Sequence, residues 1–133
     1  MTLTGGCHCG AVRYVIADGA SPHHVAACHC SDCRRASGAP LVSWALFDRG
    51  VVTISGETTA YRSSDHAERL FCPRCGTGLF YVNDAVFPGQ IDIQSATLDS
   101  PDDLPAQAQI QTAERIGWVE RLADLPAFER YPG

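Results

Sequence analysis

Seven cysteines, gathered in three short clusters, constrain this chain more than any other feature of its sequence. The clusters are Cys7-His8-Cys9, Cys28-His29-Cys30-Ser31-Asp32-Cys33 and Cys72-Pro73-Arg74-Cys75. An odd number of cysteines does not suit a fully paired disulfide framework. Spacings of one or two residues are instead typical of thiolates that converge on a metal ion. The clusters therefore predict that metal coordination ties distant parts of the chain together.

The first and third clusters together offer the four ligands of a closed zinc site. Cys72 and Cys75 have the spacing of a zinc knuckle, in which a tight turn aims both sulfur atoms at one ion. Cys7 and Cys9 lie two residues apart, so on an extended strand both side chains face the same side. We therefore expect a structural Zn²⁺ on all four. The alternatives are idle thiols or a redox-active Cys-x-x-Cys, but the redox motif requires a βαβ setting that this sequence lacks.

The middle cluster predicts a different kind of site. Cys28, Cys30 and Cys33 can bring three sulfur atoms to one point, and three protein ligands with an exchangeable fourth position are typical of a reactive zinc. Three thiolates leave a negative centre, which acidifies water weakly, so thiol chemistry is favoured over hydrolysis. The alternative is a structural site completed by a histidine. His29 alternates away from its neighbours, which leaves His23, His24 and His66 as candidate fourth ligands.

Residues near the middle cluster are candidates for substrate binding. Arg34 and Arg35 follow it directly, and their charge can offset the anionic centre, lower thiol pKa values or clamp a substrate carboxylate. The alternative is a solvated helix end. Trp44 and Tyr61 are candidates for a pocket wall, although aromatic side chains in strands are more often core residues.

The pattern of short apolar runs between turn residues predicts a mainly β, antiparallel fold with little helix. We expect residues 1–133 to form a single domain. Residues Ser31 to Ser37 are expected to form one short helix, and Leu98–Ala106 a loop. The tail from Ile110, with Trp118 and Phe128, is expected to pack back on the sheet. The expected strands are Val12–Ala17, His24–Cys28, Leu41–Phe47, Val51–Ile54, Thr58–Tyr61, Gly78–Val82 and Ile91–Gln94.

The composition of the chain limits the kinds of partner that the protein is expected to bind. The net charge of -5 disfavours nucleic acid, because an acidic surface repels phosphates. No apolar run approaches the roughly 18 residues of a membrane helix. The first residues lack the basic start and apolar core of a signal peptide, so we expect a cytoplasmic protein with reduced thiols. The sequence does not predict an oligomeric state.

At its cysteine clusters the chain resembles the glutathione-dependent formaldehyde-activating (GFA) family, also called the CENP-V/GFA domain. The matching segments are residues 5–14, 28–39 and 71–77, with the ending from Trp118 to Phe128. The resemblance implies a β-tent fold, a structural zinc on the first and third clusters, and a second zinc on the middle one. It implies condensation of formaldehyde with glutathione, a reaction classed with carbon–sulfur lyases. It further implies that Cys30 can leave its zinc and form a mixed disulfide with glutathione.

The leading hypothesis is a zinc-dependent enzyme that acts on glutathione or a related thiol adduct. Its catalytic residue would be Cys30, with Arg34 and Trp44 as substrate-binding residues. The main alternative is a glutathione or zinc carrier, or thiol sensor, without turnover. A zinc-ribbon interaction module is a third hypothesis. Methionine sulfoxide reduction is disfavoured, because it needs a cysteine separate from the zinc ligands and none follows Cys75.

Overall fold

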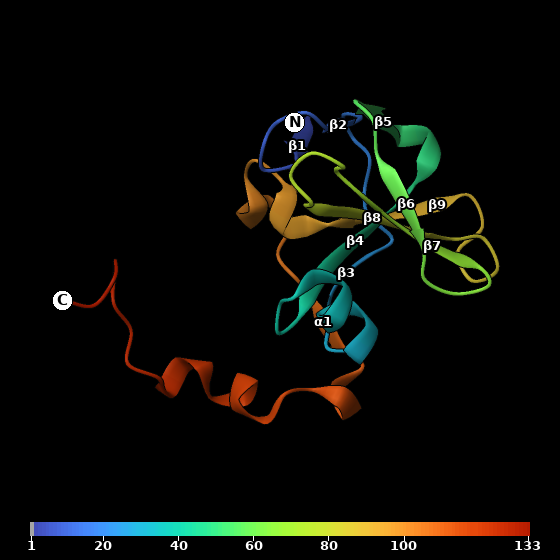
Figure 1. The fold of residues 1–133 in the computed structure, drawn as a ribbon. Helices are drawn as coiled ribbons and strands as arrows, with labels where there is room; N and C mark the ends of the chain where they lie inside the picture. Colours follow the sequence, from blue (N-terminus) through green and yellow to red (C-terminus); the bar gives the residue numbers. More distant parts are fainter. Residues whose placement is uncertain (1) are drawn as a thin grey trace.

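A computed structural model describes residues 2–133 and shows two β-sheets packed on one another (Figure 1). The prediction of a mainly β fold is confirmed. The smaller sheet has the strand order β1-β2-β5, and both of its pairings are antiparallel. Its strands are β1 (Leu3–Gly6), β2 (Arg13–Ile16) and β5 (Val52–Ser55).

The larger sheet has seven strands in the order β10-β3-β4-β9-β8-β7-β6. Its pairings are antiparallel except at one edge, where β10 runs parallel to β3. The prevailing antiparallel pairing agrees with the prediction, and the parallel pair at this edge was not predicted. The strands are β3 (His24–Cys28), β4 (Val42–Asp48), β6 (Thr59–Arg62), β7 (Ala67–Phe71), β8 (Gly78–Asn83), β9 (Gln90–Gln94) and β10 (Ala108–Ile110).

Helix α1 (Ser31–Ser37) is confirmed with the predicted bounds. It ends at Gly38, which adopts a left-handed φ of 72° and donates its amide to the Arg34 carbonyl. A glycine tolerates this conformation because it has no Cβ. The remaining helical segments are short 3-10 turns: η1 (Arg49–Val51), η2 (Ser95–Thr97), η3 (Pro101–Asp103), η4 (Thr112–Glu114) and η5 (Gly117–Asp124). Among residues 2–133, no helix has both the length and the apolar character needed to cross a bilayer.

The two faces of the larger sheet have different surroundings, because side chains alternate along each strand. On β4, Ala45 and Phe47 point into the main core, which also contains Tyr14 of the smaller sheet and Phe80 of β8. Trp44 lies on the opposite face, in a second apolar cluster with Cys28, Cys33 and Val42. One face of the sheet thus holds the fold together, and the other carries the middle cysteine cluster beside α1.

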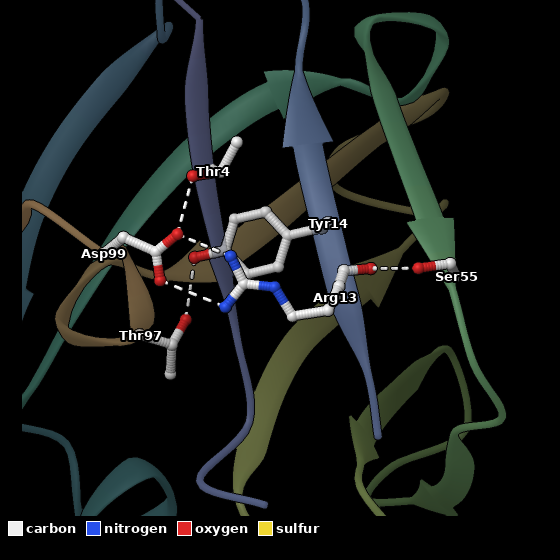
Figure 2. Close-up of polar contacts among 6 residues, drawn as sticks. All are labelled: Thr4, Arg13, Tyr14, Ser55, Thr97 and Asp99. Atoms are coloured by element: carbon white, nitrogen blue, oxygen red, sulfur yellow. Dashed lines mark hydrogen bonds and ion pairs between the residues drawn. The ribbon is translucent and has the colours of Figure 1, made fainter. Parts of the chain in front are cut away.

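A polar network ties the smaller sheet to the segment that follows β9 (Figure 2). The Arg13 guanidinium binds both carboxylate oxygens of Asp99, and Thr4 donates to the same carboxylate over 2.6 Å. The buried Tyr14 hydroxyl lies 2.8 Å from the Thr97 hydroxyl. Hydrogen bonding to Arg13 lowers the pKa of Asp99 to about 2. These contacts fix the ends of strands that are far apart in the sequence.

Two parts of the chain differ from the sequence-based expectation. Strands β1, β7 and β10 were not predicted, since each is short and Ala67–Phe71 includes Glu68 and Arg69, which weaken the β-type pattern. The prediction that the tail packs back on the sheet is wrong. Only β10 pairs with it, and the chain beyond runs past α1 and away from both sheets (Figure 1). Trp118 and Phe128 are 44% and 63% exposed.

Candidate metal centres and the adjoining cavity

The first and third cysteine clusters meet in space and have the geometry of a metal site. Sulfur atoms of Cys7, Cys9, Cys72 and Cys75 all lie within 4.8 Å of one another. The Cys7–Cys9 and Cys9–Cys72 separations are 3.6 and 3.8 Å. A zinc tetrahedron with Zn–S bonds of about 2.3 Å requires sulfur separations of about 3.8 Å. The four thiols therefore fit a closed tetrahedral ion, and they connect the loop after β1 to the β7–β8 turn.

Hydrogen bonds around this cluster favour the thiolate forms of Cys7 and Cys75, whereas the pKa of Cys9 is raised to about 11 despite a hydrogen bond from the Ala11 backbone, because burial and the neighbouring thiols oppose its ionisation. The Val12 amide donates to the Cys7 sulfur over 3.2 Å, and the Cys75 amide donates to Cys72 over 3.5 Å. The Thr77 hydroxyl, 3.3 Å from the Cys75 sulfur, lowers the pKa of Cys75 to about 5. Donors aimed at sulfur stabilise negative charge. Because Cys7 and Cys72 also belong to the main core, the cluster is part of the folded scaffold.

The middle cluster brings three sulfur atoms together at the junction of β3 and α1. Cys28 ends the strand, Cys30 caps the helix, and Cys33 lies in its first turn, with all three sulfurs within 4.8 Å of one another. Cys30 accepts the Cys33 amide over 3.2 Å. Cys28 and Cys33 are buried, whereas Cys30 is half-buried. Of the three thiols, Cys30 is therefore the most accessible to a second molecule.

Among the described residues, no histidine nitrogen joins this three-sulfur group. His29 is fully buried and points away, as its alternation predicted, with its Nε2 2.9 Å from the Gln109 side-chain oxygen. His23 pairs with Asp48 over 2.9 Å, and His66 is exposed. His24 lies on the same cavity as the three sulfurs. In this structure the middle cluster is a group of cysteines alone.

Burial, hydrogen bonds and one cation determine the pKa values of Cys28 and Cys33 in the middle cluster. Burial raises the pKa of Cys28 to about 12, and it also raises the pKa of Cys33. A hydrogen bond from Trp44 and the Arg69 guanidinium both oppose this at Cys33, and the nitrogens of that guanidinium lie 3.8 and 3.9 Å from the sulfur. The same group lies 5.1 Å above the centre of the Tyr81 ring. Sequence reasoning missed Arg69, because nothing in the order of residues indicates that β7 reaches this face.

A cavity of about 260 Å³ opens beside the three sulfurs. Its walls include Cys28, Cys30, Cys33, Trp44, Arg69 and Asp92. Two neighbouring hollows of about 340 and 350 Å³ share Arg69 with it. Trp44, the half-buried thiol of Cys30 and the Arg69 cation thus line one space large enough for part of a small thiol compound.

Arg34 and Arg35, which follow the cluster in sequence, do not line the 260 Å³ cavity. Arg34 belongs to the side of α1 near the tail, where hydrogen bonding to Ser31, together with the Arg34 charge, lowers the pKa of Glu114. Arg35 and Tyr61 line the 340 Å³ hollow. The substrate-binding role of Arg34 stays a prediction, and Arg69 is the arginine found against the sulfurs.

The fold and its sites define a class: a mainly β protein with two cysteine clusters that could each hold a metal ion, one closed and one beside a cavity. A family model described as glutathione-dependent formaldehyde-activating enzyme matches residues 2–114. The chain belongs to this family.

Individual relatives agree with this assignment. A Halomonas elongata protein with the provisional name glutathione-dependent formaldehyde-activating enzyme is 30% identical, over 90% of this chain and 81% of its own. An uncharacterized lyase of Schizosaccharomyces pombe is also 30% identical, over 74% of this chain and 80% of its own. The crystal structure of a Rhodobacter sphaeroides protein aligns with a TM-score of 0.62 and 26% identity, covering 80% of this chain and 98% of that one.

Proposed function

We propose that this protein is a zinc-dependent carbon–sulfur lyase that acts on glutathione or a related thiol adduct. The observation that carries this proposal is the half-buried thiol of Cys30, set between two buried cysteines on the wall of a cavity. Family membership and the names of the relatives support the substrate class. Because the function needs free thiols, we place the protein in the reducing cytoplasm.

The two clusters would have different tasks. Cys7, Cys9, Cys72 and Cys75 would hold a structural zinc, since their sulfur separations fit a closed tetrahedron. Cys28, Cys30 and Cys33 would hold a second zinc with an exchangeable position. A zinc bound there would supply a Lewis acid that tolerates sulfur ligands.

The proposed reaction joins a thiol to formaldehyde. The sulfur forms a bond to the carbonyl carbon, the carbonyl π electrons move to oxygen, and the oxygen takes a proton equivalent to the one lost by the thiol. The product is the S-hydroxymethyl adduct, and the reverse reaction is the cleavage of a carbon–sulfur bond. In this chain Cys30 would exchange with the incoming thiol, and Trp44 would wall the cavity.

Arg69 would assist in binding. Its guanidinium already lies at the cysteine cluster and between three hollows, so it can offset the negative sulfurs and donate to a substrate carboxylate. Arg34 remains the arginine predicted from sequence for the carboxylate. The kinetics of Arg34→Met and Arg69→Met variants separate the two: the variant that loses the carboxylate contact raises KM for glutathione but not for 2-mercaptoethanol, which has no carboxylate.

The test of the proposed function is adduct formation above the spontaneous rate. Zinc-loaded protein is mixed with formaldehyde and glutathione, and S-hydroxymethylglutathione is followed by NMR exchange. We expect acceleration by the wild-type protein and loss of it in Cys30→Ser, with the fold retained. Glutathione binding without acceleration for formaldehyde or any other aldehyde would contradict the enzyme and leave the carrier or sensor.

A further inference from the structure

A row of side chains crosses the cavity face of the larger sheet. Asp92 on β9 is the register partner of Leu46 on β4, and Leu46 is in turn the partner of His24 on β3. On its other side Asp92 pairs with Tyr81 of β8, which pairs with Arg69 of β7. Directly paired residues share a face of the sheet. The row therefore places one carboxyl group and two basic side chains on a single wall.

Asp92 is the unusual member of this row. Its side chain is 8% exposed, and its buried Oδ1 atom has no hydrogen-bond partner. The Nε2 atom of His24 lies 3.6 Å from that oxygen, too far for a hydrogen bond. A buried polar atom without a partner is costly, and such atoms are rare in folded proteins. Asp92 lines the 260 Å³ cavity, so its Oδ1 atom can accept a hydrogen bond from a ligand group that enters the cavity.

The distance along β3 between His24 and the three sulfurs determines which part of a bound ligand can donate to Asp92. His24 and Cys28 are four residues apart on β3, which corresponds to about 13 Å between their Cα atoms. The Asp92–His24 end of the cavity is therefore remote from the atom that reacts at the three sulfurs. A group bound at Asp92 belongs to a part of the ligand several bonds from its thiol, so the role is recognition rather than chemistry.

The charged groups around Asp92 indicate that the donor carries a positive charge. The groups that face Asp92 are His24 from β3 and Tyr81 from β8, with Arg69 one strand further, while β4 contributes the uncharged Leu46. Burial raises the pKa of Asp92 to about 7, and burial also lowers the pKa of His24. At neutral pH the histidine is mostly uncharged, so an ionised Asp92 lacks a cation. A protonated amine supplies both the charge and the missing hydrogen bond.

We propose that Asp92 and His24 form the amine-recognition end of the cavity, and that the thiol bound at Cys28, Cys30 and Cys33 carries a protonated amine several bonds from its sulfur. This inference rests on the proposed function. It selects peptide-length thiols with a free amine, such as glutathione, over short thiols in which the amine cannot reach Asp92.

The raised pKa of Asp92 predicts how the affinity for an amine-bearing thiol depends on pH. In the free protein Asp92 holds its proton below about pH 7. An ammonium group favours the carboxylate, so binding releases a proton in that range. The affinity for an amine-bearing thiol therefore falls as the pH drops below 7, and the affinity for an amine-free thiol does not follow this trend.

The experiment compares glutathione with glutaryl-cysteinyl-glycine, which lacks only the amine, by calorimetry on zinc-loaded protein. We expect the wild type to prefer glutathione by about tenfold or more, as a charge-assisted hydrogen bond allows. Asp92→Asn should lose this preference and bind the deamino compound as before. The matched control is Asp48→Asn, which removes a carboxylate from an exposed histidine pair outside the cavity.

Each outcome separates this inference from the proposed function. Equal wild-type affinities for the two compounds, or a preference that survives in Asp92→Asn, would overturn amine recognition even if adduct formation is accelerated. An Asp92-dependent preference without acceleration would support the amine site and contradict the enzyme. Binding of neither thiol would contradict both. Proton release, measured from binding heats in buffers of different ionisation enthalpy, tests the wild type without any substitution.

Discussion

Arg69 places two guanidinium nitrogens 3.8 and 3.9 Å from the sulfur of Cys33, across 36 positions of sequence. Strand β7 carries the arginine and α1 carries the cysteine, so the contact exists only in the assembled fold. It puts a positive charge against a cluster in which burial opposes the ionisation of Cys28 and Cys33. The chemistry of the middle cluster therefore depends on the register of the sheet as well as on its own cysteines.

Substituting this arginine should weaken metal binding at the middle cluster. We expect Arg69→Met to raise the pKa of Cys33 and to lower zinc affinity there by about 10- to 100-fold, the usual effect of losing an outer partner of a ligand. Competition with a chromophoric chelator measures this. Arg34→Met, which alters the arginine adjacent in sequence, should leave the affinity nearly unchanged; a loss equal to that of Arg69→Met would contradict the assignment.

The two clusters should differ in their effect on folding. Cys72→Ser removes a buried ligand of the closed site, and a structural zinc can contribute about 10–16 kcal/mol, comparable to the whole stability of a domain of about 5–15 kcal/mol. We expect this variant to be unfolded by circular dichroism. Cys30→Ser should fold and lose only capture of glutathione. With glutathione disulfide as the reagent, wild-type Cys30 displaces one glutathione and keeps the other as a mixed disulfide, and this adduct should be missing from the variant by mass spectrometry. Similar damage from both changes would refute the division between the sites.

The buried hydroxyl of Tyr14 should contribute measurably to stability. Tyr14→Phe removes its hydrogen bond to Thr97 while keeping the ring that packs edge-on against Phe80. We expect a loss of about 0.5–1.5 kcal/mol, measured by denaturant unfolding. Tyr61→Phe is the control, since that side chain is 57% exposed and its hydroxyl is not in the core. A larger loss in the control would contradict the role of the network in Figure 2.

The carboxylate of Asp99 should make stability depend on pH in acid. Hydrogen bonding to Arg13 holds its pKa at about 2, below the unfolded value of about 3.9. The contribution is therefore present above the unfolded value and is lost as the pH falls from about 4 towards 2. We expect Asp99→Asn to flatten this part of the curve of melting temperature against pH. An unchanged acid limb would argue against the ion pair.

Removing the tail beyond η5 should cost little stability. Leu125, Phe128 and Tyr131 are 49%, 63% and 97% exposed, so they bury little apolar area on folding. We expect deletion of residues 125–133, which keeps the buried Val119 of η5, to change the free energy of unfolding by less than about 1 kcal/mol. Deletion from residue 107 onward also removes β10, the partner of β3, and should destabilise the protein strongly. Equal effects of the two deletions would show that the tail packs more tightly than described.

Local patterns predicted much of this protein, and long-range pairing explains what they missed. The bounds of β3 and α1 agree with the expectation, because strand propensity, a capping residue and a glycine stop all act within a few residues. The four-sulfur cluster was predicted from two spacings. Arg69 and Asp92 were not predicted, since their place on the cavity is set by pairing across β3, β4, β9, β8 and β7.

In the tail, the sequence predicted packing that the structure does not show. Trp118 and Phe128 suggested burial because aromatic side chains are usually covered, yet both lie on a segment that leaves the sheets after β10. Composition alone does not say whether an apolar residue finds a surface to pack on. The edge pairing of β10 with β3 fixes where the tail starts, and Gln111, with a φ of 56°, begins its turn away from the strand.

The two sulfur clusters of this fold are proposed to hold metal differently, the first as a closed site and the second with a position open to a guest thiol. Zinc content of purified, reduced protein, measured with and without excess glutathione, tests this proposal most directly. We expect about two zinc ions per chain, falling to about one with glutathione, with the loss confined to the middle cluster. One zinc at the outset, or two that withstand glutathione, would contradict the account.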